Sequence, residues 1–344
     1  MSDIVYIGEQ SPCQQHAGGK AVEDVECVLN GVYSKLTTLY TMPGRRELFN
    51  YARTFCHNYS CLAEIEKNCK NRVIIIQYPH YNYSSLLKEK LYTILSNNKT
   101  ILLVHDVNSI RFNGDIRKEI DILNKACVVI LHSQNMADYL KERGLTVSTV
   151  NLNMFDYLLG GLPSQENYHL GKDIVFAGNL GKSKFLTELA EENALGLSLN
   201  LYGPNLDANL KNKVHWLGSY SPDEIPFKLQ GSFGLVWDGN SVHGCTGFIG
   251  DYLKVNYPHK LSLYIAAGIP VITWKRAAIA QIVEDYNIGF TVDSLSEISA
   301  NIDLLHKDDY QMYLQNIANL QKKTISGVST RSAFEEAVII ASKG

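Results

Sequence analysis

The sequence predicts an α/β protein built from two doubly wound domains, each a parallel sheet covered by helices on both faces. Short, nearly continuous apolar segments of strand length alternate with amphipathic segments of helical length along most of the chain. This pattern is typical of parallel strands buried on both faces. The alternation fades between Val150 and Lys172 and then restarts, and 344 residues suffice for two domains.

Residues 1–155 form the expected N-terminal domain. A helix is expected from Gly19, because aliphatic residues recur at helical spacing between Val22 and Val32, and a long amphipathic segment covers about residues 45–69. The expected strands are rich in β-branched residues, which favour strands. They are residues 3–8, 37–41, 72–77, 100–105 and 127–131.

Residues 156–171 form the expected linker, because Gly160, Gly161, Pro163 and Ser164 lie there without periodicity. Residues 172–325 form the expected C-terminal domain. Residues 326–344 are expected to be a helix that crosses back to the N-terminal domain. The strands expected in the second domain are residues 173–177, 197–202, 214–217, 233–237, 271–274 and 289–292.

Composition narrows the class of protein. The net charge of −3 does not suggest a nucleic-acid partner, and no apolar run is long enough to span a bilayer. The N-terminus does not resemble a secretory signal. The seven cysteines form no C-x-x-C pair, and Cys56, Cys61 and Cys69 have the wrong spacing for zinc. We therefore expect free thiols and a cytoplasmic location.

The segment 256–272 reads as a helix with both ends marked. Asn256 can cap it, Pro258 suits its first turn, and Gly268 suits the left-handed position after its last turn. The first turn carries His259 and Lys260. A helix N-terminus already favours anions, so a cation there is electrostatically unfavourable unless an anion binds nearby. The segment therefore predicts a phosphate site.

Other polar turns follow strands of the second domain. Ligands of open α/β sheets bind outside the carboxyl ends of the strands. Gly178, Asn179 and Lys184 follow strand 173–177, Tyr202 ends the next strand, and Asp238 follows strand 233–237. Each turn alone is also compatible with ordinary strand-exit chemistry. Together with segment 256–260 these make four turns, and the basic residues in two of them favour a ligand.

The first domain offers fewer candidates. Gly18 lies in a glycine-bearing segment after the first strand, where a backbone could approach a ligand closely. Asp106 ends strand 100–105 and can act as a general base, or it can cap the next segment or pair with Arg111. His132 is expected to be structural. The glycine-rich segment 244–250 is expected to be a flexible loop that closes on a ligand.

Several motifs resemble one enzyme family. The helix–glycine–proline–strand signature of residues 266–272 resembles GT-B glycosyltransferases. Residues 176–180, 220–226, 234–239 and 252–260 are similar to accessory glucosyltransferases (glucosyltransferase 3 type), which extend O-GlcNAc on bacterial serine-rich-repeat adhesins. Sequences labelled beta-1,6-galactofuranosyltransferase share the signature, including His105-Asp106 followed by Ser109-Ile110-Arg111.

The resemblance implies two Rossmann-like domains facing across a cleft. It implies transfer of a hexose, glucose or N-acetylglucosamine, from a UDP-sugar to a GlcNAc-modified serine-rich-repeat adhesin, by a homo-oligomer (dimer or tetramer) that needs no cofactor. The chain has no Asp-x-Asp motif after a strand, so metal-independent chemistry is expected. A galactofuranosyl- or other hexosyltransferase of cell-surface polysaccharide synthesis and a non-catalytic GT-B partner protein are the alternatives.

The resemblance also assigns roles to residues. Many retaining GT-B enzymes carry two glutamates eight residues apart, where this chain has Val255 and Leu263, which favours inversion with a carboxylate base. The expected catalytic residues are Asp106 and Lys260. Uridine is expected near Tyr202. The expected nucleotide-sugar-binding residues are Gly18, Gly178, Asn179, Lys184, Tyr202, Asp238, Asn256, His259 and Lys260, with no metal ligands.

Overall fold

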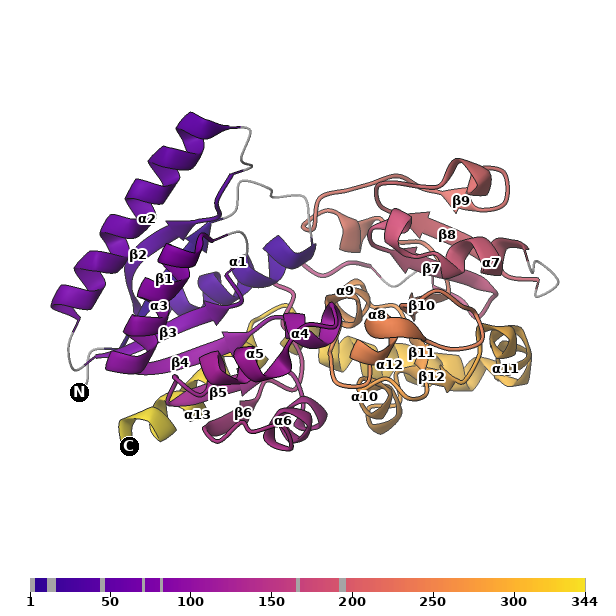
Figure 1. Cartoon of the computed structure of the whole chain (residues 1–344). Coiled ribbons are helices and arrows are strands. Elements are labelled where there is room, and N and C mark those ends of the chain that lie inside the picture. The colour runs from indigo at the N-terminus through magenta and orange to yellow at the C-terminus, as the bar shows by residue number, and fades with distance from the viewer. Residues whose placement is uncertain are drawn as a thin grey trace. The chain divides into compact units, whose positions relative to one another are not determined.

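Two α/β units make up the computed structural model (Figure 1). The first contains Met1–Gln14, Gly18–Asn153 and Val328–Gly344, and the second contains Gln15–Ala17 and Met154–Gly327. The structure describes residues 4–10, 17–43, 47–69, 72–80, 83–164, 168–191 and 196–343, without the side chains of residues 17 and 18.

The first unit contains a six-stranded sheet in the order β2-β1-β3-β4-β5-β6, and each pair of neighbours is parallel. The five strands predicted from apolar runs are present. The edge strand β6 was not predicted, because its four residues include only one aliphatic side chain, Val150. The strands are β1 (Ile4–Gln10), β2 (Ser34–Tyr40), β3 (Val73–Tyr78), β4 (Lys99–Val104), β5 (Val128–Leu131) and β6 (Ser148–Asn151).

Helices cover this sheet, and the C-terminal helix α13 packs against β3, β4, β5 and β6 (Figure 1). Its small residues Ala333, Ala337 and Ala341 are buried together with Phe334, so the helix lies close to the strands. The helices of the unit are α1 (Ala17–Asn30), α2 (Leu48–Asn68), α3 (Ser85–Asn97), α4 (Asn108–Arg111), α5 (Ile116–Leu123), α6 (Gln134–Lys141) and α13 (Val328–Lys343).

The second unit contains a parallel sheet in the order β12-β11-β10-β7-β8-β9. All six strands predicted for this part of the chain are present. Their central residues are almost completely buried, as expected for strands covered on both faces. The strands are β7 (Asp173–Ala177), β8 (Ser198–Tyr202), β9 (His215–Trp216), β10 (Phe233–Val236), β11 (Val271–Trp274) and β12 (Gly289–Val292).

The helices of the second unit include one that replaces part of a predicted loop. Segment 244–250 was expected to be a flexible loop, but α8 begins at Gly247, so that expectation is wrong for its second half. The α-helices are α7 (Phe185–Glu191), α8 (Gly247–Tyr252), α9 (His259–Ala267), α10 (Ala280–Asp285), α11 (Ile298–Leu304) and α12 (Lys307–Thr324), and η1 (Leu180–Lys182) is a short 3-10 helix.

The helix α9 begins two residues later than predicted. Its N-cap is Pro258, and no side chain caps this end, so the prediction that Asn256 caps the helix is wrong. The Asn256 N–H instead donates to the Tyr252 carbonyl at 2.9 Å, which continues the preceding turn. The other end is as predicted. Gly268 has φ +81°, and Ile269 N–H bonds to the Tyr264 carbonyl at 2.9 Å, closing a Schellman motif.

The expected linker is packed into the second unit. The Ser262 hydroxyl donates to the carbonyl of Phe155, the residue before this segment, at 2.7 Å, and the hydroxyl of Tyr168 within it donates to the Ala267 carbonyl at 3.1 Å, so both contacts join this part of the chain to α9. Tyr157 is buried, and its hydroxyl donates to the Pro222 carbonyl at 2.6 Å. The division between the units therefore falls at Asn153 and Met154 rather than after a free linker.

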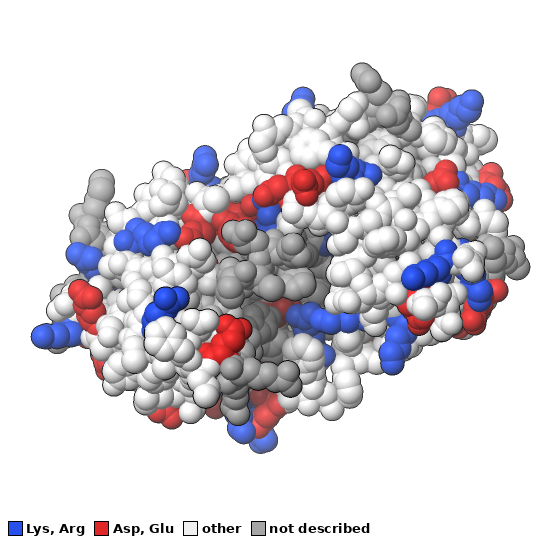
Figure 2. All heavy atoms as spheres, turned by 90° about the horizontal axis from the view of Figure 1, so that it is seen from above, with Lys and Arg blue, Asp and Glu red and all other residues white. Residues whose placement is uncertain are grey.

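The surface carries mixed charge. On the face seen in Figure 2, lysine and arginine side chains are interspersed with aspartate and glutamate, and much of the area is uncharged. Among the described residues, no helix is both long enough and apolar enough to cross a membrane.

Candidate functional site

The strand order of the second unit reverses between β7 and β10. From β7 the chain extends the sheet through β8 and β9, and from β10 it extends it the other way through β11 and β12. The two strands pair only through Phe233 with Ile174 and Gly234 with Val175, and they separate beyond these residues. Doubly wound sheets bind ligands at such a point, outside the carboxyl ends of the strands.

Tyr264 of α9 occupies the place where the two strands separate. Its hydroxyl accepts a hydrogen bond from the Ala177 N–H at 3.0 Å and lies 3.2 Å from the Leu235 carbonyl, so it bridges β7 and β10. Gly234 makes room for the ring, because a Cβ at that position would lie 2.4 Å from Tyr264. Burial raises the pKa of Tyr264, which keeps the hydroxyl protonated and able to donate.

Lys260 lies one helical turn before Tyr264, on the same face of α9. Its Nζ donates to Oδ1 of Asp238 at 3.1 Å and lies 4.9 Å from the centre of the Phe176 ring. Asp238 follows β10 and Phe176 belongs to β7, so the ammonium is held where these strands end. Gly178 has φ +151°, and a Cβ there would lie 3.3 Å from the Lys260 Cε. The glycine therefore gives the lysine stem its room.

The ion pair changes the electrostatic argument made from sequence. Lys260 was expected to carry a positive charge that only a ligand would balance, but Asp238 already balances part of it. The two side chains are 19% and 26% exposed, so both reach solvent. An ammonium has three N–H donors, and one goes to Asp238. Among the described residues Lys260 has no second acceptor, so two donors stay available beside the N-terminus of α9, which no side chain caps.

The turn after β7 is held by Asn179. Its Oδ1 accepts from the Gly181 N–H at 3.2 Å and from Nδ2 of Asn205 at 3.2 Å, and it caps η1. The Gly178 N–H donates to the Tyr202 carbonyl at 3.0 Å, which ties the turn to the end of β8. Lys184 is exposed, directly before α7. Asn179 therefore shapes the turn, and Lys184 places an exposed positive charge directly before α7.

The structure does not support Tyr202 as a direct ligand contact. Its side chain is 1% exposed, its hydroxyl donates to the Lys228 carbonyl at 3.1 Å, and it accepts from the Gln230 N–H at 2.9 Å. Burial raises the pKa of Tyr202 to about 12. Tyr202 is thus a core residue without a free ring face. Tyr220 is 37% exposed, with its ring centre 6.4 Å from that of Tyr202.

The remaining residues predicted in the second unit have packing contacts. The His259 ring stacks on Tyr157, with centres 5.0 Å apart, and meets the edge of Phe155. Asn256 is half-buried in the turn before α9. Val255 and Leu263, the positions where many retaining enzymes carry glutamates, are buried apolar residues.

In the first unit, Asp106 pairs with Arg111. The Arg111 Nη1 donates to Oδ2 of Asp106 at 2.6 Å, which confirms the pairing alternative and leaves a role as base a prediction. His105 Nε2 lies 2.6 Å from Oε1 of Gln77. His132 is buried, with Nε2 2.8 Å from the Val104 carbonyl, which confirms its structural role. Gly18 lies in α1, and residues 14–16 of the same predicted segment are outside the described residues.

The cysteines match the expectation of free thiols as far as the structure describes them. Six are free, and Cys13 lies outside the described residues. Burial raises the pKa of Cys245 to about 12, so this thiol is protonated at neutral pH. Within the described ranges, no group of three or more His, Cys, Asp or Glu side chains is placed to hold a metal ion. Metal independence stays a prediction.

Comparison with known proteins assigns the family. Residues 5–154 match the glucosyltransferase 3-like N-terminal domain, and residues 174–337 match the glucosyltransferase 3-like C-terminal domain. Beta-1,6-galactofuranosyltransferase WbbI of Escherichia coli (strain K12) is 31% identical over 245 residues, 70% of this chain and 71% of that protein. Glucosyltransferase 3 of Streptococcus parasanguinis is 30% identical over 280 residues, 77% of this chain and 78% of that protein.

A solved structure supports the same fold. An alpha-glucosyltransferase in complex with UDP and a 13-mer DNA containing an HMU base has a TM-score of 0.62 at 12% identity, and the match covers 98% of this chain and 99% of that one. The chain therefore belongs to the glucosyltransferase 3-like family and is a glycosyltransferase with the GT-B fold.

Proposed function

We propose that this glycosyltransferase moves a hexose, glucose or N-acetylglucosamine, from a UDP-sugar to a GlcNAc-modified serine-rich-repeat adhesin. The proposal rests on the position of Lys260, which Asp238 holds where β7 and β10 separate. One N–H of its ammonium goes to Asp238, and among the described residues the other two have no acceptor. The relative named glucosyltransferase 3 and the UDP complex of similar fold support the donor class. The acceptor rests on the sequence resemblance.

The leaving diphosphate would bind Lys260 and the N-terminus of α9. Its charge grows as the glycosidic bond breaks, so a preorganised ammonium stabilises the transition state more than the bound donor. Gly178 leaves room for the lysine stem directly after β7. Lys184 would approach from the next turn. These cations would supply the neutralisation that a metal ion supplies in other transferases, so we expect metal-independent turnover.

The uracil ring would bind against Tyr220 rather than Tyr202. Tyr220 exposes ring surface, whereas the Tyr202 ring is buried. The Gly203 N–H donates to the Gly218 carbonyl at 2.8 Å, so the turns that follow β8 and β9 are joined beside these rings. Exposed tyrosine combines a flat apolar face with a polar tip, which suits a nucleobase.

Asp106 would act as the base for an inverting transfer. It would take the proton of the acceptor hydroxyl while that oxygen attacks the anomeric carbon and UDP leaves with the electrons of the broken bond. The Arg111 guanidinium orients the carboxylate by donating to its Oδ2. The carboxylate base is consistent with Val255 and Leu263 replacing the glutamate pair of many retaining enzymes.

A galactofuranosyltransferase or other hexosyltransferase of cell-surface polysaccharide synthesis is the second candidate. The 31% identity to a beta-1,6-galactofuranosyltransferase favours it. A non-catalytic partner protein is disfavoured, because the relatives are named as transferases and the Lys260 segment is intact. A cytoplasmic location and a homo-oligomer stay predictions.

A donor screen tests the proposal. The purified chain is incubated with UDP-glucose, UDP-N-acetylglucosamine or UDP-galactofuranose, each with a GlcNAc-modified serine-rich peptide, and UDP release and peptide mass are measured. We expect UDP release with one of the first two donors and a matching mass increase of the peptide. Transfer from UDP-galactofuranose alone would assign the second candidate. If the chain binds none of the three UDP-sugars, the proposal is refuted.

A further inference from the structure

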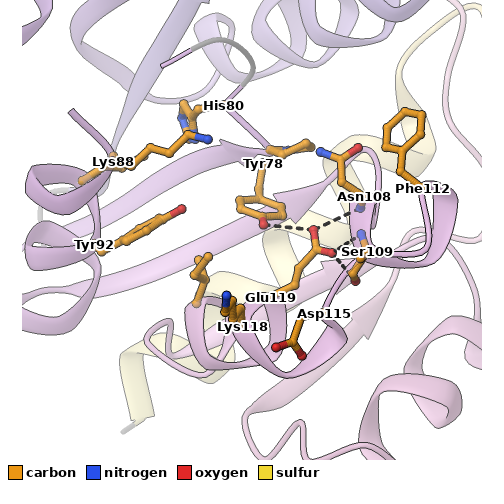
Figure 3. Close-up of a pocket in the computed structure, with 14 residues that line it drawn as sticks. Tyr78, His80, Lys88, Tyr92, Asn108, Ser109, Phe112, Asp115, Lys118 and Glu119 are labelled. Carbon is orange, nitrogen blue, oxygen red and sulfur yellow. Dashed lines mark hydrogen bonds between the residues drawn. The ribbon is translucent and has the colours of Figure 1, made fainter. Parts of the chain in front are cut away.

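A pocket of about 410 Å³ lies in the first unit, between α3 and α5 (Figure 3). Tyr78 at the end of β3 forms part of its lining, Lys88 and Tyr92 line it from α3, and Asn108 and Ser109 line it from α4. In Figure 3 the α3 side chains face those of α4 across the pocket. The volume lies within the range of small-ligand sites. No residue assigned so far to the donor site lines it.

One buried carboxylate fixes the walls of the pocket. Glu119 of α5 accepts from the Tyr78 hydroxyl at 3.0 Å and from the backbone N–H groups of Asn108 at 3.1 Å and Ser109 at 2.7 Å (Figure 3). The Ser109 hydroxyl also donates to it. These four donors join α5 to β3 and to the first turn of α4. They also use the acceptor positions of the Glu119 carboxylate. Glu119 therefore shapes the pocket and is not the group that would bind a ligand.

The turn from α4 to α5 is equally constrained. Asn113 has φ +53°, a left-handed conformation that asparagine tolerates better than most residues. A Cβ at Gly114 would lie 3.3 Å from Cα of Ser109, so a larger residue would push α4 outward. The pocket is thus preformed by contacts within the first unit.

The charges around the pocket balance. Lys88 and Lys118 line it, opposite in sign to Asp115 and Glu119. Neither lysine forms an ion pair in the part of the chain that the structure describes. Burial and the charge of Lys88 lower the pKa of His80, a further lining residue, to about 4, so it is neutral at physiological pH. The formal charge of the lining is therefore zero, which favours a neutral ligand that can accept hydrogen bonds.

Asn108 adds a requirement for a hydrogen-bond donor. Its Oδ1 is buried without a partner among the described residues, an arrangement that is costly unless a donor arrives. A small rotation would turn the amide into the pocket that it lines. A phosphate or carboxylate offers acceptors only, whereas a sugar hydroxyl both donates and accepts. A hydroxyl would satisfy Asn108 in either orientation of its amide.

We propose that this pocket binds one neutral sugar unit of the acceptor glycan. The Tyr92 ring would lie against the apolar face of the sugar, Asn108 Oδ1 would accept a hydrogen bond from a sugar hydroxyl, and Lys88 and Lys118 would donate to ring substituents. Asn108 follows Asp106 by two residues, so their Cα atoms are at most about 7.6 Å apart. The sugar would therefore be held beside the proposed base. This inference rests on the proposed function, because it names the acceptor side of the same reaction.

Binding in the absence of donor tests the pocket directly. Saturation-transfer NMR is recorded with GlcNAc-O-serine as the probe and with the Tyr92→Ala, Asn108→Ala and Lys118→Glu variants. Tyr286→Ala, which removes an exposed tyrosine of the second unit, is the matched control. We expect transfer to the sugar protons in wild type and control, and its loss in the pocket variants. Lys118 is exposed, so its variant tests the pocket even if Tyr92→Ala fails to fold.

Kinetics then separate this inference from the proposed function. In the pocket variants we expect the acceptor KM to rise on the order of 10-fold, equivalent to one lost contact of about 1.4 kcal/mol, with donor KM and UDP affinity unchanged. If the pocket variants keep the wild-type acceptor KM and still bind the sugar, the inference that the pocket binds the acceptor sugar is wrong, while the proposed function stands. Absent UDP binding in wild type would overturn the function instead, and the NMR result would still decide whether the pocket binds sugar.

Two further outcomes would overturn the inference. Inorganic phosphate that displaces the probe, and does so less well in the Lys118→Glu variant, would make the pocket an anion site. An unglycosylated serine-rich peptide that competes as well as the glycosylated one would make it a peptide site.

Discussion

The Lys260 ammonium lies 3.1 Å from Oδ1 of Asp238, where β7 and β10 separate. Both side chains are partly exposed, and such ion pairs contribute only about 0–1 kcal/mol to stability. The pair therefore does little for folding. It does fix the position of one positive charge over Gly178, at the place where a doubly wound sheet binds its ligand. The account of the donor site depends on this arrangement.

Tyr264 is expected to matter for stability through its hydroxyl. In Tyr264→Phe, the Ala177 N–H loses its acceptor in a buried position, and an unsatisfied buried donor costs about 1–3 kcal/mol. We expect a loss of that order in the free energy of unfolding, measured by urea denaturation. Tyr286→Phe removes an exposed hydroxyl and is the control. Equal stability of Tyr264→Phe and wild type would show that the hydroxyl does not hold the two strands.

Asp106→Asn is expected to slow the chemical step and leave donor binding unchanged. A general base contributes about 10²–10⁴-fold to the rate, and asparagine cannot take the proton. The measurements are kcat with acceptor and UDP affinity by calorimetry. Glu142→Gln also removes a carboxylate that pairs with an arginine, Arg143, and should keep wild-type turnover. Near-normal kcat in Asp106→Asn would remove this residue from the mechanism.

Glu9 is expected to make stability depend on pH. Burial, together with the charge of Glu26, raises its pKa from 4.5 to about 7. Between these values the native chain keeps a proton that the unfolded chain has released, so this group makes stability fall as pH rises from about 4.5 to about 7. Above that window the native state carries an unfavourable buried charge.

The Glu9→Gln variant removes this titration. Its melting temperature should exceed that of wild type at pH 8 and approach it at pH 4.5. Glu142→Gln, at an exposed site, should follow wild type at both values. A Glu9→Gln difference that is the same at both pH values would contradict the assignment.

Turnover is expected to survive removal of divalent ions. The prediction comes from the lysines at the donor site and from the sequence, which has no Asp-x-Asp motif after a strand. Initial rates are measured with EDTA and after adding back Mg²⁺ or Mn²⁺. Activity that EDTA abolishes and either ion restores would show that a metal holds the diphosphate.

Much of the fold could be predicted because its signals are local. Runs such as Val73–Tyr78 have few alternatives to a buried strand, and Gly268 marks a helix end by its own backbone preference. The edge strand β6 was not predicted, because one of its faces needs no apolar residues and its sequence therefore has no apolar run. The start of α9 was misplaced because Asn256 and Pro258 both carry N-terminal signals, and tertiary contacts decide between them.

The sites were harder to predict because they depend on distant pairs. Tyr202 stands at a strand end, as a ligand contact would, but its ring points into the core and the exposed ring belongs to Tyr220. Lys260 was identified from its helix, whereas its partner Asp238 lies 22 residues earlier. The pocket of the first unit was not predicted at all, since Glu119 meets Tyr78 across 41 residues of sequence.

Lys260→Ala tests the central claim most directly. Deleting one preorganised donor at a developing oxyanion costs about 2–4 kcal/mol of transition-state stabilisation. Lys260→Arg should restore only part of it, because a planar guanidinium does not reproduce a compact ammonium. Lys254→Ala is the matched control, since Lys254 also pairs with a carboxylate, Asp251, at an exposed site.

The measurement is kcat/KM and UDP affinity for the three variants, with circular dichroism to establish folding. We expect kcat/KM of Lys260→Ala to fall by the factor that corresponds to about 2–4 kcal/mol of transition-state stabilisation. We also expect this variant to bind UDP more weakly. Lys254→Ala should match wild type in both measurements. A folded Lys260→Ala with wild-type kcat/KM and wild-type UDP affinity would contradict the account, because the diphosphate would then bind elsewhere.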